Sequence, residues 1–195
     1  AILLSSFSYA SEPKEIDGVS IMFTDFVGFT EISKNITAKA LISELNDIFS
    51  TFDKISERHF SERIKTIGDA YMCVSGLTSS PHSSARNLVG VGEEMLAFLH
   101  TRNMNSEVQW KIRIGIASGN CMGGIVGEKK YLFDLFGDAV NTASRMESNS
   151  EAGRINIDQN THLMLKAEQE LSFEKRPMLQ VKGKGEMQMY FVGGP

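Results

Sequence analysis

Two aspartates occupy positions where a solvated side chain is not expected. Asp25 ends the apolar run VSIMFTD, and Asp69 follows Gly68 in the segment RIKTIGDAY. Burying a carboxylate is costly unless a cation or hydrogen-bond donors compensate its charge. If the fold brings the two acids together, they could hold a pair of hard divalent cations, which prefer oxygen ligands and bridge phosphates. The alternative is that each acid only forms a turn, which is common for Asp beside Gly.

A second group of candidates lies in DLFGDAVNTASRM, residues 134–146. Asn141 and Arg145 are four residues apart on a predicted helix, so they share a face. An amide and a guanidinium on one face suit a ribose or a phosphate, although a solvated helix face would look the same. Asp134 lies between two apolar residues and could accept a hydrogen bond from an exocyclic amine. Lys65, in a strand-like segment, could donate to a ring nitrogen, or its charge could protect a sheet edge from aggregation.

Glycine-rich turns supply further candidates for anion binding. The turn from Phe26 to Thr30 contains Gly28 and leads into a helix, so its backbone N–H groups could face an anion. Cations also occur in the glycine-rich segments GR (153–154) and VKGKG (181–185). Either segment could equally be a simple turn.

The composition is that of one globular domain. The chain has 195 residues, of which 42% are hydrophobic and 23% charged, which is enough for a sizeable core. A net charge of −4 argues against a nucleic-acid-binding protein, which would present a basic face. Two cysteines without a CxxC spacing favour free thiols and a reducing compartment. No apolar run approaches the roughly 18 residues of a transmembrane helix.

The first residues are expected to lie outside the folded domain. The chain begins with Ala1, and its opening AILLSSF is short and lacks the basic start of a signal peptide. We therefore expect residues 1–15 to be the stub of a linker and residues 16–195 to form one domain. On this view it is a cytoplasmic domain of a membrane-anchored or multidomain protein, with a regulatory or sensor region outside this chain.

Hydrophobic periodicity predicts alternating strands and helices. The predicted order is strand 19–25, helix 37–59, strands 63–67 and 70–76, a helix ending near 103, strand 108–119, a hairpin within 121–137, helix 138–148, strand 154–158, helix 160–167, and strands near 171–177 and 187–192. The first six form a βαββαβ pattern. We predict an α+β fold: a ferredoxin-like split βαβ core with helices on one face and extra C-terminal strands and a helix. In this topology Asp25 and Asp69 can converge, because their strands are neighbours.

Three segments together resemble the catalytic domain of class III nucleotidyl cyclases of the adenylate cyclase type. They are FTDFVGFT (23–30), KTIGDAYM (65–72) and FDLFGDAVNTASRMES (133–148), followed by the closing VKGKG. One such motif would be only suggestive, whereas all three in this order are highly specific. The resemblance covers nearly the whole chain, so it implies that residues 16–195 form a cyclase catalytic domain.

The resemblance implies a role for each candidate residue. Asp25 and Asp69, with the backbone carbonyl of Phe26, would bind two divalent cations, either Mg²⁺ or Mn²⁺. The substrate would be held by the amides around Phe29 and Thr30 at its phosphates, by Arg154 and Lys182 at its triphosphate, by Asn141 at its ribose, and by Arg145 at the transition state.

By the same resemblance, Lys65 and Asp134 match the pair that selects the base. Adenine offers an acceptor at N1 and a donor at N6, which suit a lysine and an aspartate, whereas guanylate cyclases usually carry Glu and Cys there. The resemblance therefore implies conversion of ATP to cyclic AMP and pyrophosphate. It also implies a homodimer with two composite sites, because in this family the metal-binding acids and the base-reading residues of one site come from different subunits.

Three alternatives accompany this interpretation. A guanylate or dual-specificity cyclase would be expected to differ at positions 65 and 134. A catalytically silent regulatory dimerisation module would typically lack a metal-binding aspartate or the arginine, and every matched position is filled here. An RNA-binding domain of the same topology would need exposed aromatic residues on the sheet and a basic face.

Overall fold

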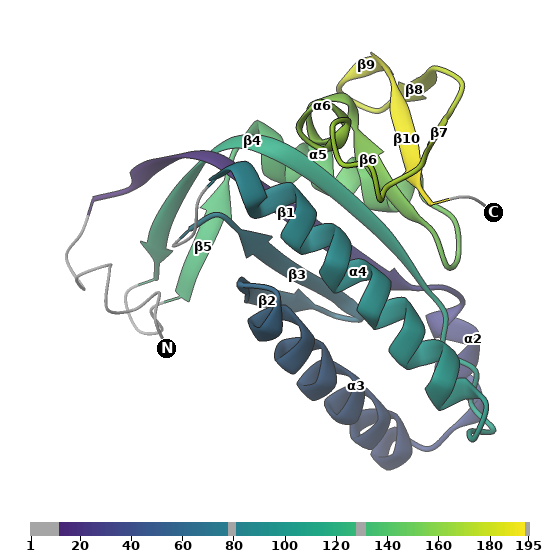
Figure 1. Ribbon diagram of the computed structural model, residues 1–195. Helices are drawn as coiled ribbons and strands as arrows, with labels where there is room; N and C mark the ends of the chain where they lie inside the picture. Colours follow the sequence, from purple (N-terminus) through teal and green to yellow (C-terminus); the bar gives the residue numbers. More distant parts are fainter. Residues whose placement is uncertain (1–11, 78–80, 128–131, 194–195) are drawn as a thin grey trace.

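The computed structural model describes residues 12–77, 81–127 and 132–193 (Figure 1). Strands and helices alternate along the chain, as predicted. The elements are β1 (Lys14–Phe26), α2 (Phe29–Asn35), α3 (Ala38–Arg58), β2 (Ser61–Ile67), β3 (Ala70–Ser75), α4 (Pro81–Asn103), β4 (Ile112–Val126), β5 (Leu132–Phe136), α5 (Asp138–Ser148), β6 (Ile155–Asp158), α6 (Gln159–Leu165), β7 (Phe173–Lys175), β8 (Leu179–Val181), β9 (Gly185–Met187) and β10 (Met189–Val192).

The main sheet has eight strands, in the order β2-β3-β1-β4-β6-β10-β7 with β5 paired to β4. Its first four neighbours, together with α3 and α4, form the βαββαβ core that the sequence predicts. Within this core β1 is central and runs antiparallel to both β3 and β4. The prediction of an α+β, ferredoxin-like fold is therefore confirmed, and the central position of β1 puts its carboxyl end beside the β2–β3 hairpin.

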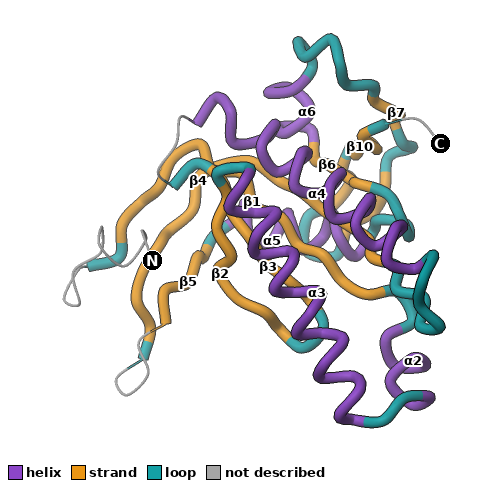
Figure 2. The backbone as a smooth tube through the Cα atoms, turned by 60° about the horizontal axis from the view of Figure 1, so that its bottom comes forward, coloured by secondary structure: helices purple, strands orange, loops and turns teal. Residues whose placement is uncertain are grey.

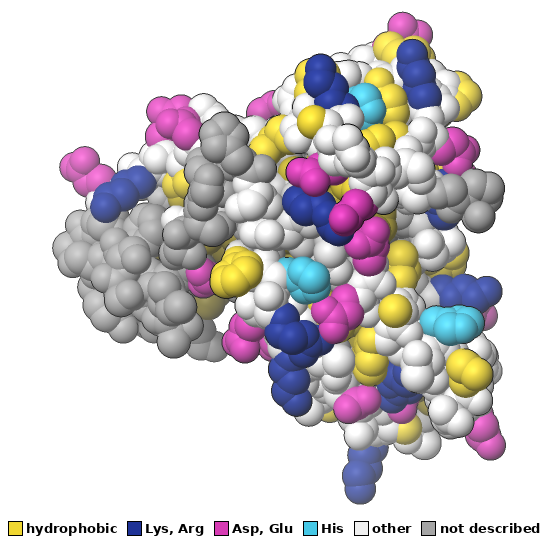
Figure 3. Space-filling view, in the orientation of Figure 1, with side chains coloured by type: hydrophobic (Ala, Val, Ile, Leu, Met, Phe, Trp, Pro, Cys, Tyr) yellow, Lys and Arg dark blue, Asp and Glu magenta, His cyan; other side chains and the backbone are white. Residues whose placement is uncertain are grey.

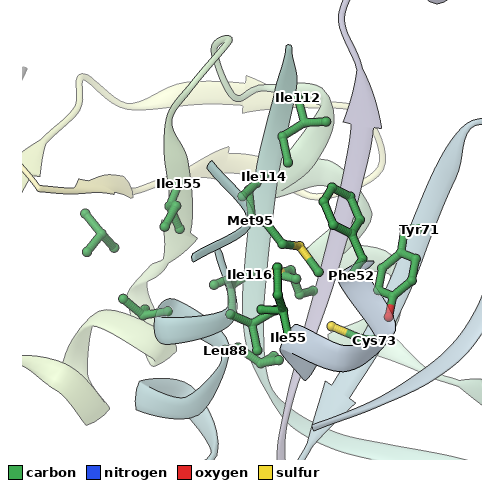
Figure 4. Packing of buried hydrophobic residues seen from close by; sticks show 14 of the residues in the cluster. Phe52, Ile55, Tyr71, Cys73, Leu88, Met95, Ile112, Ile114, Ile116 and Ile155 are labelled. Carbon is green, nitrogen blue, oxygen red and sulfur yellow. The ribbon is translucent and has the colours of Figure 1, made fainter. Parts of the chain in front are cut away.

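Apolar side chains cover both faces of the sheet, and each face has its own helices. On one face α3 and α4 pack over a core that includes Phe52, Met95 and Ile114 (Figures 2 and 4). On the other face α5 packs through Ala143 and Met146. The prediction that the helices of the core cover one face is confirmed for α3 and α4, whereas α5, for which no face was predicted, lies on the other face. Successive strand residues point to opposite faces, and β1 contributes Met22 and Phe26 to one core and Val19, Ile21 and Phe23 to the other.

Glycine in β4 allows α5 to approach closely. A Cβ added at Gly115 would lie 1.8 Å from the backbone nitrogen of Glu147. Only a residue without a side chain permits this contact. The last turn of α5 is thereby pressed against the middle of the sheet.

Strand β4 begins later and ends later than predicted. The sequence pattern starts at residue 108, but the strand starts at Ile112, because the side chain of Asn103 holds the preceding turn. Its Nδ2 donates to the carbonyl of Trp110 at 2.7 Å, and its Oδ1 accepts from the N–H of Trp110 at 2.9 Å. At its other end β4 continues to Val126 because β5 supplies an antiparallel partner for the glycine-rich stretch. The predicted hairpin is thus confirmed, with residues 128–131 outside the described part.

The cap of α3, the two cysteines and the VKGKG turn have the predicted form. Thr37 caps α3, and its Oγ1 accepts from the N–H of Ala40 at 3.2 Å. Cys73 and Cys121 are buried free thiols, and burial raises the pKa of Cys73 to about 12. The segment VKGKG forms the turn between β8 and β9. The linker remains a prediction, since β1 begins at Lys14 and residues 1–11 are not described.

The surface carries charges of both signs. On the face shown in Figure 3, Lys and Arg side chains are interspersed with Asp and Glu rather than gathered into one basic area. Within the described residues, no helix combines the length and the apolar character needed to cross a membrane.

Candidate active site

The two predicted metal-binding aspartates lie close enough for their charges to interact. Asp25 is near the end of β1, and Asp69 follows Gly68 in the turn between β2 and β3. Gly68 has a φ of 63°, a left-handed conformation that glycine adopts readily. Burial and the neighbouring charge of Asp25 raise the pKa of Asp69 above its ordinary value. The convergence expected from the topology is therefore present.

Arg113 joins this pair to a third acid. It lies directly opposite Asp25 in the β1–β4 ladder, and its Nη2 donates to Asp25 Oδ2 at 2.9 Å. Its Nε donates to Glu147 Oε1 at 2.5 Å. The side chain of Glu147 is only 12% exposed; burial raises its pKa, Arg113 opposes that shift, and the charges of Asp25 and Asp69 add to it. Arg113 thus hydrogen-bonds to two carboxylates, and its charge also acts on a third, that of Asp69.

This arrangement fits hard divalent cations. Three acids against one arginine leave an excess of negative charge, and carboxylate oxygens are the donors that Mg²⁺ and Mn²⁺ prefer. No group of three or more His, Cys, Asp or Glu residues forms a ready-made metal cage within the described residues. Any remaining ligands would have to come from backbone carbonyls such as that of Phe26, from phosphate oxygens or from water.

The predicted base-selecting residues contact each other. Lys65 of β2 donates from Nζ to Asp134 Oδ2 of β5 at 2.5 Å, although 69 residues separate them in the chain. The other oxygen of Asp134 accepts from the N–H of Leu135 at 2.8 Å, which orients the carboxylate. β2 is an edge strand of the sheet, so the charge of Lys65 could protect that edge from aggregation. The side chain nevertheless pairs with Asp134. The pair presents a cationic donor beside an anionic acceptor.

The outer face of α5 carries Asn141 and Arg145. The helix buries its opposite face through Ala139, Ala143 and Met146. The predicted shared face is therefore present. Within the described part of the chain, the side chains of Asn141 and Arg145 make no hydrogen bond or ion pair. They are free to contact a ligand.

The glycine turn after β1 has the predicted form. Gly28 has a φ of 74° and precedes α2, so Phe29 and Thr30 occupy the first turn of that helix. Backbone N–H groups in a first helical turn have no partner within the helix and can face an anion. The ring of Phe29 lies 6.2 Å from that of Trp110 and 6.3 Å from that of Phe26. These contacts anchor the turn.

Arg154 and Lys182 are the two residues predicted to hold the triphosphate. Among the described residues, neither side chain contacts the acids Asp25 and Asp69 or the pair Lys65 and Asp134. Arg154 donates to Glu174 at 2.7 Å, and its guanidinium lies 4.2 Å from the ring centroid of Phe191. Lys182 is exposed in the β8–β9 turn. Its neighbour Lys184 pairs with Asp138 at the start of α5. A triphosphate would have to compete with Glu174 for Arg154, so the roles of Arg154 and Lys182 stay predictions.

Arg113 and Glu147 were not among the site residues predicted from the sequence. A signal for Arg113 exists, because it is the one charged residue within the apolar run IRIGIA (112–117). Glu147 has a weaker signal, since it follows Met146 on the buried side of the helix. Neither signal identifies the partner, because the contacts span 88 and 34 residues.

Comparison with known proteins points to one family. A family model described as the adenylate and guanylate cyclase catalytic domain matches residues 11–194. A receptor-type guanylate cyclase of Caenorhabditis elegans, gcy-13, is 39% identical over 187 residues, which cover 94% of this chain and 18% of that protein. Guanylyl cyclase C of Homo sapiens is 39% identical over 188 residues, covering 94% and 17%. The chain thus spans less than a fifth of the length of these relatives.

Solved structures agree with the family match. The guanylate cyclase domain of RhGC from Catenaria anguillulae, in complex with GTP, is 34% identical with a TM-score of 0.87, covering 93% of this chain and 98% of that one. The catalytic core of a rhodopsin-guanylyl cyclase with converted specificity, in complex with ATPalphaS, is 35% identical with a TM-score of 0.87, covering 95% and 100%. The adenylyl cyclase CyaB of P. aeruginosa is 29% identical with a TM-score of 0.86, covering 95% and 97%.

Proposed function

The chain belongs to the class III nucleotidyl cyclase catalytic domain family, and we propose that it converts ATP to 3′,5′-cyclic AMP and pyrophosphate as a homodimer. The observation that carries the choice of ATP is the contact between Lys65 and Asp134. Adenine has an acceptor at N1 and a donor at N6, so a lysine donor and a carboxylate acceptor match its edge. Guanine presents a donor at N1 and an acceptor at O6, so the same pair would oppose it.

Whole-chain similarity favours a second candidate, a guanylate cyclase that produces cyclic GMP. The relatives gcy-13 and guanylyl cyclase C carry that name, and the RhGC domain is bound to GTP. Identity over a whole chain reports ancestry, however, whereas base choice depends on a few contacts at the purine. The rhodopsin-guanylyl cyclase described as having converted specificity and bound to ATPalphaS supports this distinction. We therefore give more weight to Lys65 and Asp134.

The proposed reaction is an in-line displacement at the α-phosphorus. The ribose 3′-oxygen gives up its proton and bonds to the α-phosphorus, while the bond from that phosphorus to the pyrophosphate oxygen breaks. When bound at Asp25 and Asp69, divalent cations would lower the pKa of the 3′-hydroxyl and neutralise charge on the leaving phosphates. The chain's own contribution is mainly position and charge.

The residues on α5 would act on the sugar and the reacting phosphate. Asn141 would hold the ribose so that its 3′-oxygen faces the α-phosphorus, and Arg145 would stabilise the charge of the pentavalent transition state. Loss of one such preorganised donor costs about 10²–10³ in rate. The absence of other side-chain partners for Arg145 among the described residues supports this role.

A homodimer is proposed because one chain carries each half of the site in a separate group. Asp25 and Asp69 form one group, whereas Lys65 and Asp134 form another. Exposed apolar side chains occur near the β2–β3 and β4–β5 hairpins, and such patches are typical of interaction surfaces. They are Ile67, Met122, Val126, Leu132 and Phe136.

Substrate competition tests the choice of nucleotide. The purified protein is incubated with Mn²⁺ and equal concentrations of ATP and GTP, and the two cyclic nucleotides are separated and quantified. Cyclic AMP should dominate by at least tenfold. Predominant cyclic GMP would refute the proposal for ATP and support the second candidate. Neither product would support the silent dimerisation module.

Mixing two impaired variants tests the composite site. Asp25→Ala removes a metal-binding acid, and Arg145→Ala removes the transition-state cation. The Asp25→Ala homodimer should be inactive and the Arg145→Ala homodimer slower by about 10²–10³, whereas their mixture should recover activity because one of the two sites in a mixed dimer retains both functions. A mixture no more active than its components, with mixed dimers demonstrated by differential tagging, would contradict shared sites.

A further inference from the structure

Arg113 contacts both parts of the proposed site, the metal-binding acids and helix α5. It donates to Asp25, on the metal-binding side, and to Glu147, on the helix that carries Asn141 and Arg145. Both partners are carboxylates, and the guanidinium uses different nitrogens, Nη2 and Nε, for them. A planar guanidinium can hold two acids in a defined geometry, which a point charge on a flexible stem cannot do as well.

The contact with Glu147 is made on a fixed part of α5. The backbone nitrogen of Glu147 lies directly over Gly115, where no Cβ fits. One residue earlier, the carbonyl of Met146 accepts from Asn156 Nδ2 at 2.8 Å. Arg113 therefore links Asp25 to the anchored last turn of α5, two residues from Arg145. Contacts of this turn with Gly115 and Asn156 hold it against the sheet, so Glu147 is kept within reach of Arg113.

We propose that Arg113 is a positioning residue that serves both active sites of the homodimer at once. Through Asp25 it orients the metal-binding carboxylate of one site. Through Glu147 it orients α5, and with it Asn141 and Arg145, which would serve the other site. This inference rests on the composite sites proposed above. It predicts that one arginine is needed in each of the two chains that build a single site.

The charges around Arg113 agree with this role. Arg113 is the cation that is hydrogen-bonded to both Asp25 and Glu147, at 2.9 and 2.5 Å. Without it, Asp25 and Glu147 would each lose a hydrogen-bond donor, and Glu147 would stay mostly buried with no ion pair among the described residues. Loss of a residue that orients a metal ligand typically costs 10- to 100-fold in metal affinity or activity.

Mixed dimers with one working site locate the effect of Arg113→Gln. In a dimer of Asp25→Ala and Arg145→Ala chains, the Arg145→Ala chain supplies the metal-binding acids, and the Asp25→Ala chain supplies α5. Arg113→Gln in the metal-supplying chain should raise the Mn²⁺ concentration for half-maximal rate about tenfold. In the α5-supplying chain it should lower kcat about tenfold and leave the Mn²⁺ dependence unchanged. An effect in only one of the two placements would overturn the dual role.

Glu147→Gln provides the matched partner experiment. It keeps the size of the side chain and removes the charge that holds Arg113 to α5. It should lower kcat in the α5-supplying chain and change the Mn²⁺ dependence in the metal-supplying chain by less than threefold. Equal losses in both placements would indicate a general structural role and would overturn the proposal.

Metal binding gives a readout that is independent of turnover. Mn²⁺ is titrated into the homodimer with 2′,3′-dideoxy-ATP, or the guanine analogue if GTP is preferred, and free Mn²⁺ is followed by electron paramagnetic resonance. The analogue has no attacking hydroxyl. Arg113→Gln should weaken Mn²⁺ binding about tenfold relative to a control, Arg86→Gln, which removes an exposed 3.5 Å pair with Glu93. Binding as tight as in the control would overturn the proposal.

Two further results keep the inference separate from the proposed function. If the starting mixture of Asp25→Ala and Arg145→Ala shows no rescue, the composite site itself fails. If rescue occurs and Arg113→Gln has no effect in the α5-supplying chain, only the present inference fails. Should Arg113→Gln not fold, Arg113→Lys keeps the charge, and it should show the same pattern with smaller losses; wild-type behaviour of this variant in both placements would overturn the proposal.

Discussion

Exchange of the base-reading pair should change the nucleotide preference. The change is Lys65→Glu together with Asp134→Cys, which gives position 65 an acceptor for the guanine N1–H. The side chain of Asp134 is 17% exposed and that of Lys65 is 37% exposed, so a wrong base would leave partly buried polar groups without partners. Each such group costs about 1–3 kcal/mol. Because Lys65 is more than a third exposed, we take about 2–4 kcal/mol for the pair, or roughly 30- to 1000-fold in the ratio of kcat/KM values.

The single variants should be worse than the double variant, because the two side chains contact each other. Lys65→Glu alone places a second carboxylate where Nζ now lies 2.5 Å from Asp134, and two acids so close disfavour joint ionisation. Asp134→Cys alone leaves the lysine without its partner. Each single should lose activity with ATP and with GTP, and the double should recover activity with GTP. The losses should therefore be strongly non-additive.

The assay measures kcat/KM for ATP and for GTP in the wild type, the two singles and the double. Lys39→Glu, a charge reversal at an exposed position of α3, controls for net charge, and thermal unfolding of each protein controls for folding. A double variant whose ATP-to-GTP ratio stays within threefold of the wild type would refute the assignment of Lys65 and Asp134. If the losses of the two single variants add up to the loss of the double variant, the contact between Lys65 and Asp134 is not the cause of the changed preference.

Two further predictions concern stability. Gly115→Ala should destabilise the protein by about 3 kcal/mol or more, because the added Cβ would overlap the backbone of Glu147. Gly119→Ala on the same strand is the control and should have a mild effect, because its Cβ would lie 3.4 Å from that of Ala139. Equal unfolding midpoints of the two variants in urea would contradict this prediction. Glu44→Gln should cost about 1 kcal/mol at pH 7: burial alone would raise the pKa of Glu44, but hydrogen bonds from Trp110 and Arg102 lower it overall. A carboxyl group whose pKa is lowered in the folded state stabilises that state above its unfolded pKa of about 4.3, and this stabilisation is lost as the pH falls through the folded pKa. The difference in free energy of unfolding between wild type and variant should therefore shrink below about pH 4. A difference that grows in acid would contradict this prediction.

The order of elements was predictable because its causes are local. Alternation of apolar residues identified the central strands, and helical spacing after the cap at Thr37 identified α3. The start of β4 was not predictable, because the side chain of Asn103, at the end of the preceding helix, holds the turn before it. The close approach of α5 to the opposite face also depends on contact between distant segments, since the missing side chain of Gly115 leaves room for the backbone of Glu147.

The sequence by itself determined which chemical groups this protein has and the order in which they occur. Residue type and short spacing indicated candidate acids and a helix face with an amide and an arginine, and the resemblance of the motifs to cyclases implied that Lys65 and Asp134 select the base. Only the tertiary structure decided that Lys65 bonds to Asp134 and that Arg113 connects Asp25 to Glu147. These contacts join residues 34 to 88 positions apart, and such pairs depend on how the sheet and α5 pack, which no local pattern specifies.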